Sequence, residues 1–320
     1  MQERREIDKT TDANNNNIYN SPAYMLANVT FKTALISFSV SALTQPFQAT
    51  LTHFQLQSGA TSSLKNGLFR GLYRGFFPYA LAGQKRGAVA VSAKQANREV
   101  TEEQLEAELP IRQRWLGTFL FSQADLLISN GLGNKSKLES ANIITNANFN
   151  WSFTNYVKLT WANWGSRTAS GFINFAALGF VGDYISSFYK FEDEFYNKLC
   201  GGATAGVIAT ALTTVPNSYA DRKILASKME NGRLLTVSPY TMFRQMQAQV
   251  KTGGRGVILD CIRFTLFKEF LIRSPQSALT FSIIFGLDHA LGIEPLRKIW
   301  PKSKEKPDTD EIADRVSKGL

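Results

Sequence analysis

The stretch Gly71-Leu72-Tyr73-Arg74-Gly75-Phe76 stands directly before an apolar segment, and its outline occurs twice more in the chain. Thr265-Leu266-Phe267-Lys268-Glu269-Phe270 also has a leucine, two aromatic residues three positions apart, and a base after the first of them. Thr160-Trp161-Ala162-Asn163-Trp164 keeps the two aromatic residues at the same spacing. Three matches, each at the start of an apolar segment, indicate an internal repeat.

Weakly apolar segments alternate along the chain with polar connectors that are long and short in turn. This alternation predicts three hairpins, each made of a helix, a long loop and a second helix. The six apolar segments are residues 26–54, 76–97, 112–132, 164–189, 195–225 and 270–292.

The composition fits a helical bundle whose helices each have one wet face. Apolar residues make up 44% of the 320 residues, the mean hydropathy is slightly negative, and no long run is purely apolar. A bundle around a water-filled cavity would have this composition. A basic soluble helical protein is the alternative, since the net charge is +10. The bases do not gather in one stripe, so we expect no nucleic-acid partner.

The charge of the connectors favours the membrane interpretation. The three long loops, taken as residues 53–75, 129–165 and 221–262, each carry net positive charge. The two short connectors, taken as residues 94–114 and 190–198, are slightly acidic. Loops on one side of a membrane protein are enriched in Lys and Arg, so this alternation predicts six spans with both termini on the acidic side.

Prolines and glycines inside the apolar segments suggest how the helices bend and pack. Pro46 and Pro216 lie late in the first and fifth segments, where a proline would kink a helix. The alternative is that each proline ends a soluble helix. Gly202 and Gly206 lie one turn apart and would allow a close contact with another helix.

At this point the chain resembles the mitochondrial carrier family. That family has three repeats, with P-x-[DE]-x-x-[KR] on each odd helix and a pattern close to G-x-[YF]-R-G-[FW] at the start of each even helix. The second pattern is nearly intact in residues 71–78, and Arg273-Ser274-Pro275-Gln276 begins a stretch like a carrier sixth helix. The resemblance covers about residues 26–292, and some intracellular bacteria secrete carrier-like proteins into host mitochondria.

The resemblance implies an all-α membrane protein with six transmembrane helices in three pseudo-repeats. Short surface helices are expected in the long loops, at residues 62–70, 148–160 and 238–251. The expected divisions are a disordered polar N-terminus at 1–25, carrier repeats at 26–98, 99–190 and 191–292, and a charged tail at 293–320.

The chain departs from the family at its gates, the residues that close the two ends of the cavity. The first repeat has Gln48 and Leu51 where the family has an acid and a base, and the third has Ser218 and Asp221. The second keeps Asp125 but lacks the base, so the usual ion pairs are not expected. The candidate gate and kink residues are Pro46, Gln48, Asp125, Pro216, Asp183 and Asp288.

A substrate site follows from counting along the even helices. Positions six and seven residues after Phe76, Trp164 and Phe270 face the cavity in the family; here they are Ala82, Gly83, Ser170, Gly171, Gln276 and Ser277. Cations stand nearby, and cations in a cavity favour an anionic solute. Alternatively, they snorkel or pair with acids. The candidate substrate-binding residues are Gln84, Lys85, Arg86, Arg167, Ser170, Gly171, Arg273 and Gln276.

We therefore expect transport of a small anionic metabolite, with a nucleotide among the candidates, by alternating access. The alternative is a transport-inactive carrier-fold scaffold or insertase. The two cysteines and two histidines have no metal-ligand spacing, so we expect no metal, no cofactor and no enzyme activity. The resemblance implies a monomer in the mitochondrial inner membrane, in a host cell if the source is a bacterium, in contact with bilayer lipid such as cardiolipin.

Overall fold

The computed structural model describes residues 22–56, 67, 71–83, 111–145, 147–292 and 295–299. The chain divides into two compact units, one of Met1–Lys32 with Leu291–Leu320 and one of Thr33–Ala290. The expected disorder of residues 1–25 falls almost wholly outside the described residues, as do the surface helix at 62–70 (except Gly67) and most of the charged tail.

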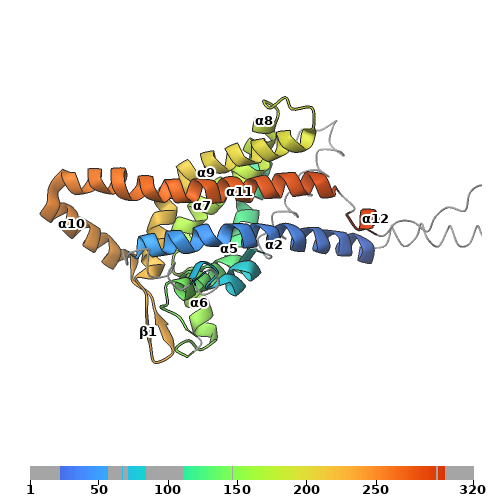
Figure 1. Ribbon diagram of the computed structural model, residues 1–320. Helices are drawn as coiled ribbons and strands as arrows, with labels where there is room; N and C mark the ends of the chain where they lie inside the picture. The colour runs from blue at the N-terminus through green and yellow to red at the C-terminus, as the bar shows by residue number, and fades with distance from the viewer. Residues whose placement is uncertain are drawn as a thin grey trace, which may run out of the picture. The chain divides into compact units, whose positions relative to one another are not determined.

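Helices make up most of the described chain (Figure 1). The long ones are α2 (Pro22–Gln55), α5 (Ile111–Ser140), α9 (Glu194–Leu225), α10 (Pro239–Asp260) and α11 (Phe267–Leu291). The shorter ones are α6 (Phe153–Trp161), α7 (Trp164–Ala176), the π-helical turn η2 (Ala177–Val181), α8 (Gly182–Ser186), the π-helical turn η3 (Cys261–Leu266) and α12 (Pro295–Ile299).

The apolar segments fall on helices where the structure describes them, except for residues 187–189 and 292 at two segment ends. The second segment is helical over 76–83, and its remainder lies outside the described residues. The third segment was predicted too short, because α5 continues to Ser140. Helices also run through Pro46 and Pro216, so the alternative that each proline ends a helix is wrong. The surface helices expected at 148–160 and 238–251 correspond to α6 and α10.

Within the part of the chain that the structure describes, three helical stretches are long and apolar enough to cross a membrane: Ala23–Gln55, Glu194–Leu225 and Pro239–Leu291. Large apolar side chains such as Leu43, Leu212 and Val215 point away from the protein on these helices. Such exposure is costly in water and favourable in lipid. The described chain is thus mostly helical with apolar spans, whereas six crossings and three repeats stay a prediction.

Two glycines let α9 and α11 approach each other closely, as the sequence predicted. A Cβ atom on Gly206 would lie 2.6 Å from the carbonyl oxygen of Ser277, and one on Gly202 would lie 2.8 Å from that of Phe281. No side chain fits at those distances, so the two backbones are in direct contact. An apolar cluster beside this contact joins η2, α9 and α11; it contains Ala177, Leu178, Ala205, Ala209, Phe281 and Phe285.

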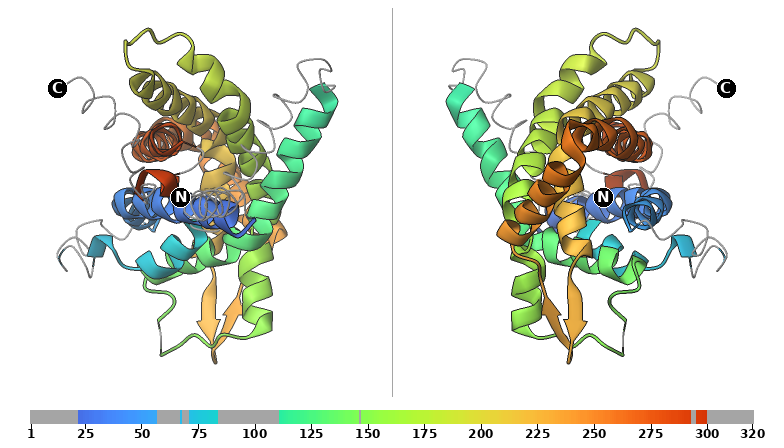
Figure 2. Two further views of the ribbon diagram at one scale, coloured as in Figure 1. Left: turned by 90° about the vertical axis from the view of Figure 1, so that its right-hand side faces the viewer. Right: turned by 90° about the vertical axis from the view of Figure 1, so that its left-hand side faces the viewer.

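A short β-hairpin follows α9, and the expectation of an all-α protein is wrong in this detail. Strands β1 (Lys228–Glu230) and β2 (Arg233–Leu235) pair antiparallel, and Figure 2 shows them beside α6. Asn231 and Gly232 both have positive φ, as the tight turn requires. The Asn-Gly pair was a hairpin signal that the helical repeat pattern obscured.

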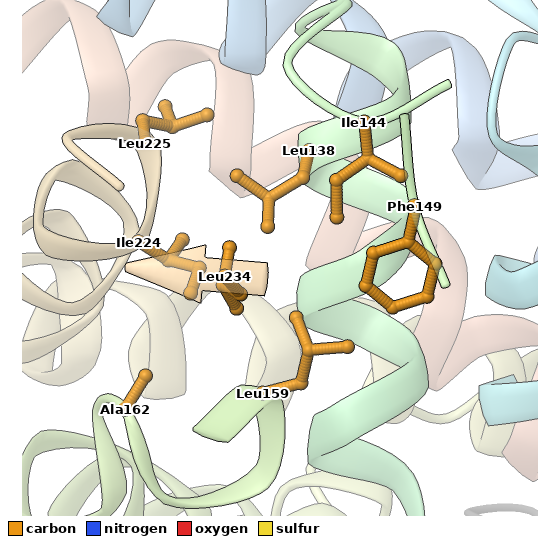
Figure 3. Packing of buried hydrophobic residues seen from close by; sticks show 8 residues of the cluster. All are labelled: Leu138, Ile144, Phe149, Leu159, Ala162, Ile224, Leu225 and Leu234. Carbon is orange, nitrogen blue, oxygen red and sulfur yellow. The ribbon is translucent and has the colours of Figure 1, made fainter. Parts of the chain in front are cut away.

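The hairpin belongs to an apolar core that also contains the ends of α5, α6 and α9 (Figure 3). Its buried members are Leu138, Ile144, Phe149, Leu159, Ala162, Ile224, Leu225 and Leu234. The buried side chain of Asn155 ties the hairpin to α6, since it accepts from Leu234 N at 3.0 Å and donates to Gly232 O at 2.8 Å. This core fixes the ends of α5 and α9 relative to each other.

The unit made of the two chain ends has its own polar contacts. Asn28 Oδ1 accepts from Leu296 N, at 2.9 Å, and so caps the first turn of α12. Lys32 Nζ donates to Gly292 O at 2.7 Å. Part of the tail predicted at 293–320 is therefore helical and held by side chains of α2.

Candidate functional site

A cavity of about 250 Å³ lies among α2, α5, α7, α9, α11 and residues 76–83. The six positions found by counting along the even helices all line it: Ala82, Gly83, Ser170, Gly171, Gln276 and Ser277. Gln48 and Asp125 line it as well. The counting therefore located the cavity, although contact of these residues with a solute stays a prediction.

Three larger side chains occupy a matching position one turn earlier on the even helices. Tyr79, Arg167 and Arg273 each stand three residues after the repeated aromatic residue, and all three line the cavity. Tyr79 is fixed by its hydroxyl, which lies 2.8 Å from Thr44 Oγ1 and 3.4 Å from Gln276 Nε2. The repeated aromatic spacing thus leads to one hydroxyl and two guanidinium groups in the cavity lining.

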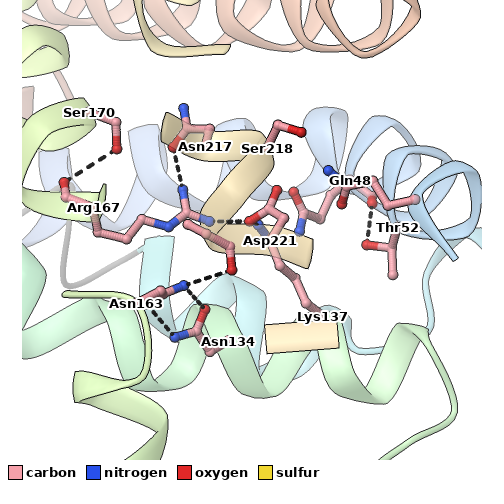
Figure 4. A network of polar contacts seen from close by, with 12 residues as sticks. Gln48, Thr52, Asn134, Lys137, Asn163, Arg167, Ser170, Asn217, Ser218 and Asp221 are labelled. Atoms are coloured by element: carbon pink, nitrogen blue, oxygen red, sulfur yellow. Dashed lines mark hydrogen bonds and ion pairs between the residues drawn. The ribbon is translucent and has the colours of Figure 1, made fainter. Parts of the chain in front are cut away.

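The carboxylate of Asp221 is fully buried on α9 and binds three cations from three other helices. Figure 4 shows two of them, Lys137 and Arg167, beside Asp221. Its Oδ1 atom accepts from Lys137 Nζ on α5 and from Arg167 Nη2 on α7. Its Oδ2 atom accepts from Arg273 Nη2 on α11 at 2.8 Å. We call these four residues the Asp221 cluster. Burying a lone carboxylate is very costly, and three cationic partners offset that cost.

Glu269 forms a second buried cluster next to the first. Its Oε1 atom accepts from Arg222 Nη2 at 2.7 Å and from Ser218 Oγ at 3.0 Å. Its Oε2 atom accepts from Gln55 Nε2 at 3.0 Å and from Arg273 Nη2 at 3.2 Å. Arg273 belongs to both clusters, so one connected network joins α2, α5, α7, α9 and α11.

The sequence led us not to expect the family's usual ion pairs, and no pairing at other positions was foreseen. Among the described residues, buried ion pairs form at positions that the signature pairs do not use. Sequence reasoning missed Lys137 because it placed that residue in a loop. It did not single out Glu269, although Glu269 stands in the third repeated stretch at the position that Gly75 has in the first. At Asp221, the sequence indicated only that the basic residue of the family pattern is missing. Its opposite charge, at a position where a base was expected, was a signal that the pairing had been rearranged.

Buried asparagines hold the Asp221 cluster in place. Asn163, between α6 and α7, exchanges hydrogen bonds with Asn134 on α5 at 3.1 and 3.2 Å. Asn163 Nδ2 also donates to Ala220 O of α9 at 3.4 Å, directly before Asp221. Asn130 Nδ2 donates to Asn163 Oδ1 at 3.0 Å. These amides connect α5, α7 and α9 where the charged side chains meet.

The other predicted site residues lie in different surroundings. Asp183 on α8 is exposed and pairs with Lys198 Nζ at 3.0 Å, and Asp288 is half-buried on α11. Asp125 accepts from Ser129 Oγ at 3.0 Å. Gln84, Lys85 and Arg86 lie outside the described residues.

The two clusters contain two carboxylates, Asp221 and Glu269, and four cations, namely Lys137, Arg167, Arg222 and Arg273, so positive charge is in excess. The guanidinium group of arginine and the ammonium group of lysine donate hydrogen bonds readily to phosphate or carboxylate oxygens. Among the described residues, no group of His, Cys, Asp and Glu could hold a metal ion.

Comparisons with known proteins give a family and a relative. Residues 24–301 match the family described as mitochondrial SLC25 homologues. The chain is 53% identical over 313 residues, covering 97% of this chain and 95% of the relative, to a protein of Legionella pneumophila named serine protease Lpg1137. No solved structure matches. The relative's name contradicts the expectation that this chain is not an enzyme.

Proposed function

The chain belongs to the family of mitochondrial SLC25 homologues, and from that membership we propose that it carries a small anionic solute across a membrane. The observation that carries this proposal is the cavity of about 250 Å³ with Lys137, Arg167 and Arg273 in its lining. Charges at this depth of a membrane protein usually face a cavity or a partner.

The size of the cavity bears on the choice of anion. Sites for drug-sized ligands usually measure about 300–1,000 Å³, so about 250 Å³ suits phosphate or a small carboxylate better than a whole nucleotide. A nucleotide would need the helices around the cavity to separate first. Phosphate and small dicarboxylates are therefore the first solutes to test, with nucleotides next.

Six crossing helices in three repeats, acting as a monomer, are part of the same proposal. Helix α10 supports contact with a bilayer surface, because it buries none of its side chains and exposes Tyr240, Phe243 and Met246. Its charged side chains before Asp260, which are Arg244, Lys251 and Arg255, are all basic and would suit anionic lipid such as cardiolipin.

The proposed location is the mitochondrial inner membrane of a host cell. The family's description names mitochondria, and the relative comes from a bacterium. Fractionation of cells that express the tagged chain would test this. Resistance to alkaline extraction within inner-membrane vesicles supports the proposal, and a signal confined to the cytosol or to other membranes contradicts it.

Transport is tested with purified full-length protein in liposomes. The vesicles are preloaded with phosphate, malate or ATP, and uptake of the same labelled anions is followed over time. Saturable uptake above that of protein-free vesicles supports the proposal. If folded and inserted protein transports none of these three anions, the proposal of their transport is wrong. That result would favour the alternative of a transport-inactive scaffold or insertase.

Serine-type proteolysis is a second candidate function, favoured by the relative that is named a serine protease. Such a reaction needs a serine hydroxyl whose proton a nearby base can accept. The cavity serine Ser170 donates to the backbone carbonyls of Ser166 and Arg167, at 3.2 and 3.3 Å, which does not activate it. Ser129 Oγ lies 2.7 Å from the backbone carbonyl oxygen of Asp125 and 3.0 Å from its carboxylate, so a possible base is near this hydroxyl, but the shorter contact is again to a backbone carbonyl.

An active-site probe separates proteolysis from transport. The full-length protein in detergent is treated with a fluorophosphonate, and labelled serines are located by mass spectrometry, with heat-unfolded protein as the control. Labelling of one serine in the folded protein alone, together with cleavage of a peptide library that stops on labelling, supports a protease. Equal labelling of folded and unfolded protein, without cleavage, argues against it.

A further inference from the structure

The cations that hold Asp221 are the same cations that face the cavity. Lys137, Arg167 and Arg273 all belong to the cavity lining, while Asp221 is fully buried behind them. A solute in the cavity would therefore meet side chains that already bind a carboxylate. The substrate and Asp221 would need the same donors.

Part of the donor set of these cations is already engaged. Arg167 Nη2 donates a hydrogen bond to Asp221. Arg167 Nη1 donates another to Asn217 Oδ1 at 2.7 Å. Arg273 Nη2 is already shared between Asp221 and Glu269. Arg273 Nε is buried and has no hydrogen-bond partner among the described residues, so this guanidinium retains a donor.

We propose that the Asp221 carboxylate occupies the place on Lys137, Arg167 and Arg273 that an anionic substrate takes, so that substrate binding and Asp221 binding exclude each other. This inference rests on the proposed anion transport. Carboxylate and phosphate oxygens are equivalent acceptors for arginine and lysine, and a substrate with two or more charges competes well with one carboxylate.

The competition would couple binding to movement. Asp221 ties α9 to α5, α7 and α11 through its three cations. When an anion takes those cations, α9 loses its charged links and can separate from the other helices. The anion's affinity is lowered by the free energy of releasing Asp221, and by linkage Asp221 is released more readily when the anion is bound.

Binding of inorganic pyrophosphate to the purified full-length protein tests the proposal by calorimetry. Asp221→Asn removes the competing charge and keeps the shape, so we expect its Kd for pyrophosphate to fall at least about tenfold below that of the wild type. The matched control is Asp125→Asn, which removes one negative charge from the cavity lining. The Asp125 carboxylate accepts a hydrogen bond from Ser129. A purely general charge effect would tighten binding equally in both variants.

The outcomes separate this inference from the proposed function. Equal tightening in Asp221→Asn and Asp125→Asn, or weaker binding in Asp221→Asn, overturns the competition alone. Absence of pyrophosphate binding in the wild type and both variants, with no uptake in liposomes, overturns anion transport as well.

If Asp221→Asn does not fold, the double variant Asp221→Asn/Lys137→Met is compared with Lys137→Met. The double variant removes one charge of each sign from the Asp221 cluster, so its buried charges stay closer to balance. Tighter pyrophosphate binding in the double variant than in Lys137→Met supports the competition, and equal binding contradicts it.

Discussion

Arg273 Nη2 donates to Asp221 Oδ2 at 2.8 Å, and this contact joins α11 to α9 behind the cavity. The same nitrogen lies 3.2 Å from Glu269 Oε2, so one guanidinium links two fully buried carboxylates. A membrane protein that keeps two such acids inside must neutralise them, because an unpaired buried charge is very costly. The network is therefore expected to matter for both stability and function.

Glu269→Gln should destabilise the protein by about 3–5 kcal/mol, as loss of one partner from a buried ion pair does. The new amide would direct donor hydrogens toward Arg222 and Arg273, whose guanidinium groups cannot accept a hydrogen bond. Unfolding in mixed detergent measures the change. Asp183→Asn is the control; it removes an exposed carboxylate and should cost less than about 1 kcal/mol. Equal effects would mean that burial of Glu269 adds nothing.

Gly206→Ala should separate α9 from α11 and lower the free energy of unfolding by about 1–3 kcal/mol, as overpacking does. The added Cβ atom would lie 2.6 Å from Ser277 O, and a backbone atom cannot move aside cheaply. The comparison is Gly117→Ala on α5, where a Cβ atom meets nothing within 4 Å and a gain of up to about 1 kcal/mol is expected. If both variants are equally stable, the two backbones are not in direct contact.

Asn155→Ala should loosen the β1–β2 hairpin. The side chain accepts from Leu234 N and donates to Gly232 O, and the loss leaves buried backbone groups unpaired, at about 1–3 kcal/mol. Limited proteolysis measures the result, with faster cleavage expected within 228–235. Gln247→Ala, at an exposed position on α10, should leave the cleavage rate at that of the wild type. An unchanged rate for Asn155→Ala would show that the apolar core alone holds the hairpin.

The sequence was sufficient to locate the long helices and the cavity because both follow from periodic features. An aromatic pair at the spacing of Phe267 and Phe270 stands before three of the apolar segments, and counting from this one reached Gln276 and Ser277 in the cavity lining. Gly202 and Gly206 likewise predicted a close helix contact, which α9 and α11 make. Such features repeat along one chain and need no knowledge of partners.

The charged network could not be predicted in the same way, because its contacts join residues far apart in sequence. Lys137 and Asp221 are 84 positions apart, and Gln55 and Glu269 are 214 apart. The signature positions suggested only that the usual pairs were lost, and Glu269 stands where the first repeated stretch has Gly75, which forms no ion pair. The hairpin was missed for a related reason, since its strands are short and Asn231-Gly232 carries most of the signal.

Anion transport through the cavity is tested most directly by uptake of labelled phosphate into liposomes, comparing the wild type with Arg167→Gln. Arg167 is the better target than Arg273, because Arg273 also holds Glu269. Arg244→Gln, the same substitution on the exposed helix α10, is the control. We predict saturable uptake by the wild type and the control, and at least about a tenfold lower rate for Arg167→Gln, as loss of a charge-assisted contact implies. Equal rates in all three proteins, or uptake no greater than that of protein-free vesicles, would contradict the account.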